Sequence, residues 1–214
     1  MKIIEVLDMY LDLIKKRIKN SVIQPLGVKG KFSILLPIIE KDNKLQLLYE
    51  VRAEDMGTQP GEVSFPGGRI ENGETAREAA IRETEEELGI SRDQIEMFGQ
   101  IDYLVPLFNI AIYPFVGYLK IKSLDELDIN KAEVKEVFTV PINYFLENEP
   151  ETHTISCKYE INESFPYHLI PDGEDYDWRD GEYPINFYEY NGNVIWGMTA
   201  RFTTNLIEKI KEKT

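Results

Sequence analysis

The sequence predicts a globular protein of the α/β (α+β) class, in which strands and helices share one core. Two runs rich in β-branched and aliphatic residues, 31–40 and 44–52, flank Lys41-Asp42-Asn43 and predict a hairpin. Residues 75–88 lack glycine and proline and precede Gly89, which is typical of a helix and its stop. Strand character then returns, and a helix is expected at 199–213.

The remaining elements follow from the same signals. Apolar residues at helical spacing predict an amphipathic helix over 2–18, with packing as its expected role and partner binding as the alternative. We expect further strands at 63–65, 94–104, 109–121 and 132–140, the last leading into a short helix at 142–147. The acidic, aromatic segment 148–184 predicts a hairpin around 151–161 and a long irregular loop over 165–184. Asn191-Gly192 predicts a hairpin turn.

Composition limits the classes of protein that fit. The 214 residues suit one domain with small additions, and 43% hydrophobic residues favour a packed core. The formal charge of -14 repels polyanions, so we expect no nucleic-acid partner and no anionic membrane partner. A small anionic substrate fits if bound cations reverse the sign locally.

The N-terminus and the cysteine and histidine content add three expectations. The first residues lack a signal-peptide core, and no uninterrupted apolar run reaches the roughly 18 residues of a membrane span, so we expect a cytoplasmic enzyme. Cys157 is the single cysteine, and we interpret it as a small strand residue rather than a nucleophile. His153 and His168 have no ligand spacing, so no zinc site is expected.

Three glutamates carry the strongest chemical signal. Positions i, i+3 and i+4 share one face of a helix, so Glu83, Glu86 and Glu87 project together. Carboxylates this close repel one another unless a cation lies between them, and hard divalent ions prefer oxygen ligands. The alternative is a solvated acidic helix face. The glycines of Phe65-Pro66-Gly67-Gly68 favour the metal site, since bare backbone allows close approach to a ligand.

Arg82 stands among these acids. It could pair with Glu74, Glu78 or Glu86 and so fix the preceding loop to the helix. We therefore expect Arg82 to serve the site more by position than by direct chemistry.

The spacing of these residues resembles the Nudix box, which is matched at Gly68, Glu74, Arg82, Glu83, Glu86, Glu87, Gly89 and Ile90. Thr84 stands where an aliphatic residue is usual, which affects helix packing rather than the ligand set. The resemblance implies a single Nudix domain over 1–214, a mixed β-sheet sandwiched between helices, with the helix 2–18 and the segment 148–184 as additions.

The resemblance also implies a mechanism in which water attacks a pyrophosphate phosphorus with the help of Mg²⁺ or Mn²⁺. Glu83, Glu86, Glu87 and the Gly68 carbonyl would hold the ions. The catalytic set would be Glu86, Glu83 and Arg82, with Glu86 favoured as the general base.

The segment before the box resembles the extra motif of the coenzyme A pyrophosphatase branch at Leu48, Arg52, Ala53, Gly61 and 65–68, and the run 195–201 also resembles this branch. It implies substrate binding by Arg52, Phe65, Gly67 and Gly68, with a surface charge as the alternative for Arg52. Four positions depart from the motif: Gly57 replaces its second Arg, Tyr49 and Glu50 replace Leu and Thr, and Gln59 replaces a frequent His.

Several functions stay open at this point. The first is cleavage of coenzyme A or an acyl-coenzyme A to 3′,5′-ADP and (acyl-)phosphopantetheine. A second is hydrolysis of another nucleoside diphosphate derivative, such as ADP-ribose or NADH. A third is a non-catalytic Nudix-like ligand sensor. Phe65 and Trp196 are expected to be core aromatics more often than base-stacking platforms, and the added segments make a homodimer a further expectation.

Overall fold

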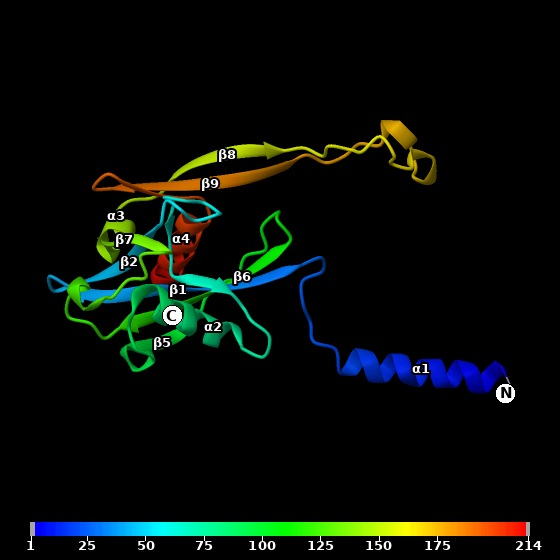
Figure 1. Cartoon of the computed structure of the whole chain (residues 1–214). Coiled ribbons are helices and arrows are strands. Elements are labelled where there is room, and N and C mark those ends of the chain that lie inside the picture. The colour runs from blue at the N-terminus through cyan, green and yellow to red at the C-terminus, as the bar shows by residue number, and fades with distance from the viewer. Residues whose placement is uncertain (1–2, 213–214) are drawn as a thin grey trace.

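The computed structural model describes residues 3–212, with side chains from residue 7 onward, and its centre is a seven-stranded mixed sheet (Figure 1). The main path runs β3-β2-β1-β6-β5, while β4 pairs with β1 and β7 pairs with β2. Only β1 and β6 run parallel among these described pairs. The strands are β1 (Gly30–Lys41), β2 (Lys44–Arg52), β3 (Val63–Ser64), β4 (Gly67–Arg69), β5 (Ile95–Gln100), β6 (Ile110–Leu119) and β7 (Val134–Pro141).

The hairpin of β1 and β2 forms the centre of the sheet because both strands are apolar on both faces. Along β1, Leu35 and Ile39 enter one hydrophobic cluster, whereas Leu36 and Ile38 enter the other. This follows from the two-residue period of a strand. The turn contains two left-handed residues, Asp42 and Asn43, with φ of 53° and 57°, so the predicted hairpin is confirmed.

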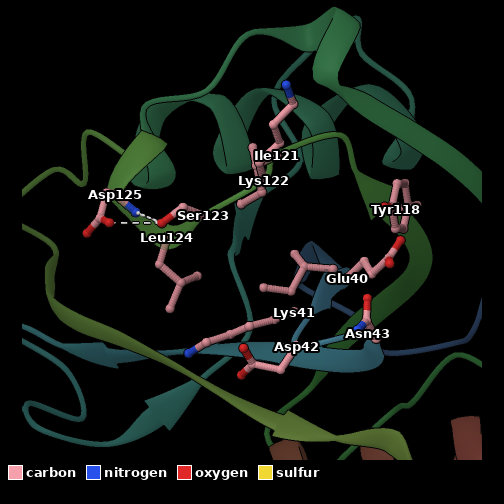
Figure 2. Close-up of a pocket in the computed structure, with 11 residues that line it drawn as sticks. Glu40, Lys41, Asp42, Asn43, Tyr118, Ile121, Lys122, Ser123, Leu124 and Asp125 are labelled. Atoms are coloured by element: carbon pink, nitrogen blue, oxygen red, sulfur yellow. Dashed lines mark hydrogen bonds between the residues drawn. The ribbon is translucent and has the colours of Figure 1, made fainter.

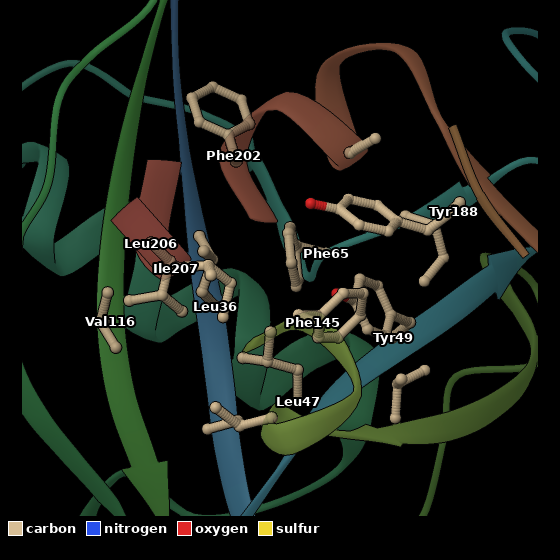
Figure 3. Close-up of a cluster of buried hydrophobic side chains, with 14 of the residues drawn as sticks. Leu36, Leu47, Tyr49, Phe65, Val116, Phe145, Tyr188, Phe202, Leu206 and Ile207 are labelled. Carbon is tan, nitrogen blue, oxygen red and sulfur yellow. The ribbon is translucent and has the colours of Figure 1, made fainter. Parts of the chain in front are cut away.

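Helices cover both faces of the sheet, so the expected sandwich is confirmed. On one face, α2 (Ala76–Leu88) packs through Ala80, Ile81 and Leu88. On the other, α3 (Ile142–Glu147) and α4 (Gly197–Lys211) supply Phe145, Phe202 and other apolar residues to the cluster of Figure 3. None of the described helices is long and apolar enough to cross a membrane.

A second, three-stranded sheet corrects the prediction for the acidic segment. β8 (Glu151–Cys157) pairs with β9 (Gly181–Tyr190), and β9 pairs with β10 (Asn193–Trp196) through the predicted Asn191-Gly192 turn. The expected hairpin within 151–161 is therefore wrong, and the irregular segment is 158–180. Local pattern identified a strand at β8, but its partner lies far along the chain, where no turn signal indicates it.

Two other elements differ from expectation. β4 is a strand that local pattern does not predict, because Gly67 and Gly68 lack the side chains that favour strands, yet it pairs with residues 32–34 of β1. The N-terminal helix, α1 (Ile3–Lys19), is present, but it extends away from the body (Figure 1) and its described apolar side chains are exposed, so the packing role is not seen. Residue 2 of the predicted first helix and residue 213 of the last lie outside the described residues.

The packing of α4 gives a stability prediction. Leu206 is 5% exposed in the cluster of Figure 3, whereas Ile210 on the same helix is 47% exposed. We expect Leu206→Ala to lower the free energy of unfolding by about 2–5 kcal/mol, since it leaves a cavity. The control Ile210→Ala should change it by less than about 1 kcal/mol. Denaturant unfolding measures both, and equal losses would contradict the packing described.

Candidate functional site

The helix that carries the three glutamates is fixed at both ends. Thr75 is the N-cap: its hydroxyl accepts the N–H of Glu78 at 3.2 Å, and the Glu78 carboxylate accepts the N–H of Thr75 at 2.7 Å. This capping box satisfies two amide groups of the first turn. Glu78 is thereby engaged with Thr75. At the other end, Gly89 takes the left-handed conformation, with φ of 63°.

Arg82 ties the loop before the helix to the glutamates. Its guanidinium donates to both carboxylate oxygens of Glu74, at 2.9 and 3.2 Å, and to the Arg69 carbonyl at 3.1 Å. It also donates from Nη1 to Glu83 at 2.9 Å and to Glu86 at 3.1 Å. Pairing with Glu74 and Glu86, two of the three expected partners, is therefore present. The Arg82 hydrogen bonds hold the pKa of Glu74 below its usual value.

The two glycines let the glutamates approach the backbone of β4. The N–H of Gly67 donates to Glu87 Oε2 at 2.8 Å. A Cβ at Gly68 would overlap the carboxylate of Glu83, and a Cβ at Gly67 would overlap the backbone of β1. Any larger residue at either position would thus displace the glutamates or the sheet.

The three glutamates lie in different surroundings. Glu87 is 3% exposed, the Glu83 side chain 14% and the Glu86 side chain 55%. Burial raises the pKa of Glu87 and, less strongly, that of Glu83, because it disfavours the charged form. For Glu87 the next cause is the negative charge of Glu50. Glu83 is partly compensated by Arg82, whereas Glu87 has only the Gly67 N–H as a hydrogen-bond donor among the described residues.

Sequence reasoning missed two further acids beside this group. Glu50 on β2 is 1% exposed, and its charge raises the pKa of Glu87. Glu133, just before β7, raises the pKa values of Glu50, Glu83 and Glu87. The alternation of β2 could have placed Glu50 on the α2 face, because Leu48 packs there. No local pattern points to Glu133.

Two residues that were expected to bind substrate, Arg52 and Phe65, lie at the end of β2 and directly after β3. Arg52 ends β2, where its Nε lies 3.4 Å from the Thr58 carbonyl, and its charge partly opposes the rise that burial causes in the pKa of Glu50. Phe65 is 4% exposed and stacks on Tyr49 with ring centroids 4.7 Å apart. Phe65 is therefore a core aromatic, as was expected more often than a stacking role, and substrate binding by Phe65 stays a prediction.

The two segments that resemble the coenzyme A branch meet in space. The Thr199 hydroxyl at the start of α4 donates to the Val63 carbonyl at 3.0 Å. Beside this contact lies a groove of about 500 Å³, bordered by Val51, Gly61 and Trp196 among others. Trp196 is 40% exposed and stacks on Phe187 with an interplanar angle of 11°. Trp196 is thus a surface aromatic beside a groove, where a core residue was expected.

A larger cavity lies elsewhere. It has a volume of about 740 Å³ and is bordered by the β1–β2 turn and by residues 121–125 (Figure 2). It lies at the C-terminal end of β1, whereas β4 pairs with residues 32–34 near the other end. Its lining contains none of the clustered glutamates, so it does not form part of the candidate site.

A protein-family model of the NUDIX domain matches residues 32–159, which is more than half of the chain. The chain belongs to the Nudix family. A curated relative, the peroxisomal coenzyme A diphosphatase NUDT7 of Mus musculus, is 33% identical over 178 residues, covering 80% of this chain and 66% of that protein. The peroxisomal coenzyme A diphosphatase ndx-8 of Caenorhabditis elegans is 32% identical, covering 75% and 64%. The uncharacterized Nudix hydrolase NudL of Photorhabdus laumondii is 31% identical, covering 84% of both chains.

The departure at Thr84 in the Nudix box has a structural explanation. Thr84 is fully buried, and its hydroxyl donates to the Ala80 carbonyl one turn earlier at 2.7 Å. The polar atom is thereby satisfied inside the core, as a buried hydroxyl must be. The substitution leaves the glutamates untouched, as expected.

Nudix hydrolases generally use divalent metal ions, and the donor set of this box fits such an ion. Glu83 and Glu87 lie against the backbone of β4, and Glu50 brings a buried oxygen without a hydrogen-bond partner among the described residues. Within residues 3–212, no three acidic, His or Cys side chains stand around one point as they are now placed. As they are placed, Glu83 and Glu86 both accept hydrogen bonds from Arg82.

The buried carboxyls predict a pH dependence of the metal-free protein. Burial raises the pKa of Glu87 and Glu50 above the ordinary 4.5, so the folded state binds protons more tightly than the unfolded one. Their contribution to stability is full below the ordinary value and is lost as pH rises through the raised values. We expect the free energy of unfolding, measured with chelator present, to fall between about pH 5 and pH 9, because the raised pKa values are about 7 for Glu50 and about 9 for Glu87. Glu87→Gln should flatten this slope, and an unchanged slope would contradict the prediction.

Proposed function

We propose that the protein is a metal-dependent Nudix pyrophosphohydrolase. The observation that carries the proposal is the placement of Glu83 and Glu87 against the bare backbone of Gly67 and Gly68, with Arg82 fixing the loop between them. Carboxylates beside unobstructed backbone can hold Mg²⁺ or Mn²⁺ and leave room for phosphate oxygens.

Each residue of the box then has a distinct part. Glu83, Glu86 and Glu87 would hold the ions together with the Gly68 carbonyl. When bound, divalent ions neutralise phosphate charge and lower the pKa of a coordinated water. Glu86 is the most exposed of the three and carries the general-base role in this proposal, taking a proton from the attacking water. Arg82 positions Glu83 and Glu86 and stays outside the reaction.

For the substrate we propose coenzyme A or an acyl-coenzyme A, cleaved to 3′,5′-ADP and (acyl-)phosphopantetheine. Two relatives named above are coenzyme A diphosphatases, and the two motif segments meet at Thr199 and Val63. Arg52 is the proposed phosphate contact, since guanidinium groups bind phosphate well. The exposed face of Trp196, beside the groove, supports a stacking role for an adenine base.

Particular residues bear on the alternative substrates and on the non-catalytic alternative. Gly57 replaces a motif Arg, and the missing charge keeps ADP-ribose or NADH as the alternative substrate. A non-catalytic sensor has no need of all three box glutamates, which this chain retains. The cytoplasmic location stays a prediction, since two of the three relatives named above carry the word peroxisomal.

A substrate panel tests the proposal. The purified protein is incubated with Mg²⁺ or Mn²⁺ and coenzyme A, acetyl-coenzyme A, ADP-ribose, NADH or a dinucleoside polyphosphate, and products are separated by chromatography. We expect metal-dependent release of 3′,5′-ADP from a coenzyme A compound. Faster turnover of ADP-ribose would overturn the substrate and keep the reaction class, whereas no metal-dependent turnover would favour the sensor.

Variants of α2 provide the matched comparison for this assay. Glu86→Gln and Glu87→Gln should each lower kcat at least about 100-fold, the usual size of a general-base or metal effect. Glu85→Gln, on the same helix but without a hydrogen-bond partner in the site, should retain turnover within about threefold. Normal turnover in both Glu86→Gln and Glu87→Gln would remove the site assignment.

We also propose that two copies associate through α1. Leu7, Leu11, Ile14 and Ile18 form one apolar stripe along the helix and are 49–69% exposed. The first half of the helix carries Asp8 and Asp12, whereas the last part carries four basic residues, Lys15, Lys16, Arg17 and Lys19. An antiparallel second copy would place the acidic half of each helix against the basic half of the other while covering both stripes.

Light scattering coupled to size exclusion measures this association. We expect a mass of two 24.8 kDa chains for the wild type and of one chain for Ile14→Asp, because a charge in the stripe opposes burial. Leu26→Asp is the control, since Leu26 is fully exposed outside the helix. A wild type with the mass of one chain at all concentrations would refute the proposal.

A further inference from the structure

Glu50 stands where the coenzyme A motif has Thr, and its side chain faces the box helix. Leu48, two residues earlier on β2, belongs to the same hydrophobic cluster as Ala80, Ile81 and Leu88 of α2. Alternate residues of a strand share a face, so Glu50 points to the same side. A charged group at the centre of a sheet needs a reason, since burial of an uncompensated carboxylate is costly.

The two oxygens of Glu50 have different surroundings. Oε1 accepts the hydroxyl of Ser64 at 3.0 Å. Oε2 is buried and has no hydrogen-bond partner among the described residues. Three residues beyond Ser64, the N–H of Gly67 holds Glu87. The same short segment, Ser64 to Gly67, therefore anchors both Glu50 and Glu87.

The charges around Glu50 do not balance. Burial is the main cause of the raised pKa values of Glu50 and Glu87, and the carboxylates of Glu83 and Glu133 raise both pKa values further. The cations near them are Arg52, whose charge lowers the pKa of Glu50, and Arg82, which pairs with Glu83. Because Arg82 also pairs with Glu74 and Glu86, the carboxylates of this group outnumber its guanidinium groups when all are ionised, and a divalent cation would compensate part of the excess negative charge.

We propose that Glu50 contributes its carboxylate to the divalent-cation site formed by Glu83 and Glu87. The proposal rests on the proposed metal-dependent function and extends the acidic set from the box helix to β2. Ser64 fixes one oxygen and leaves the other available to the ion, as expected of a ligand that is oriented by a neighbouring hydrogen bond. Glu50 would thus strengthen the binding of the cation without acting in proton transfer.

The test compares stability and metal affinity in the full chain. Mn²⁺ binding is followed by the electron paramagnetic resonance of free Mn²⁺ and by the rise in unfolding temperature on adding Mn²⁺ to chelator-treated protein. The variants are Glu50→Gln, which keeps an acceptor for Ser64, and Glu50→Thr, which restores the motif residue. Glu136→Gln is the control, because Glu136 is an exposed acid on the neighbouring strand β7, opposite Val51.

We expect opposite effects on the two readouts. Without metal, Glu50→Gln and Glu50→Thr should unfold at a higher temperature than wild type, because the buried charge is gone. With metal, their Mn²⁺ affinity should fall at least about tenfold and their gain in unfolding temperature should shrink. Glu136→Gln should match wild type in both.

The outcomes separate this inference from the proposed function. Wild-type Mn²⁺ affinity in both Glu50 variants, with loss in Glu87→Gln, would overturn the role of Glu50 and leave the hydrolase intact. A wild type that binds no Mn²⁺ and hydrolyses nothing would overturn both. If Glu50→Gln does not fold, Glu50→Thr decides the question on its own.

Discussion

The burial of acidic side chains between β2 and α2 is the constraint on which the rest of the structure depends. Glu50 and Glu87 are almost completely buried, which raises the pKa of both, and the charge of Glu50 raises that of Glu87 further. Such a pair is tolerated only where backbone and side-chain donors reach it. Ser64 and the Gly67 N–H supply those donors, and both belong to the segment that forms β3 and β4. The local fold is thus organised to hold negative charge in place.

Some residues of the Nudix box hold the helix and its preceding loop in place, and others are the glutamates that carry the negative charge. Gly89 ends the helix, Thr84 faces the core, and Arg82 joins the helix to the loop. These three keep Glu83 and Glu87 at a fixed distance from the glycine backbone. Because like charges repel, the capped and glycine-stopped ends of α2 help to keep the glutamates together on one helix.

The sequence predicted what local patterns determine. The β1–β2 hairpin has apolar runs around a turn, and α2 has a cap, an uninterrupted helical run and a glycine stop, so both were found within a few residues of their observed bounds. The short strand β4 was missed because glycines carry no strand signal, and its pairing with β1 is a long-range contact. The pairing of β8 with β9 was missed for the same reason, since 158–180 separates the two strands.

The site shows the same division. The three glutamates of the box could be predicted to lie together, because their spacing places them on one face of a single helix. Glu50 was noticed only as a departure from a motif, and its importance depends on the tertiary packing of β2 against α2. Phe65 and Trp196 were both expected in the core, but only Phe65 is there, because Trp196 ends β10 at the edge of the second sheet. The residue type alone does not show that Phe65 is buried in the core while Trp196 is exposed at a sheet edge.

The arm formed by β8 and β9 has a consequence for how such a protein can change over evolutionary time. Cys157 and Gly181 are the last paired residues of the two strands, and everything between them lies beyond the sheet (Figure 1). There Trp178 contacts Tyr159, Phe165 and Tyr176, so the tip has a small aromatic core of its own. A self-contained tip of this kind can lengthen, shorten or diverge in sequence while the strands that support it stay in register. The arm is therefore a place where new specificity can arise without disturbing the acidic centre.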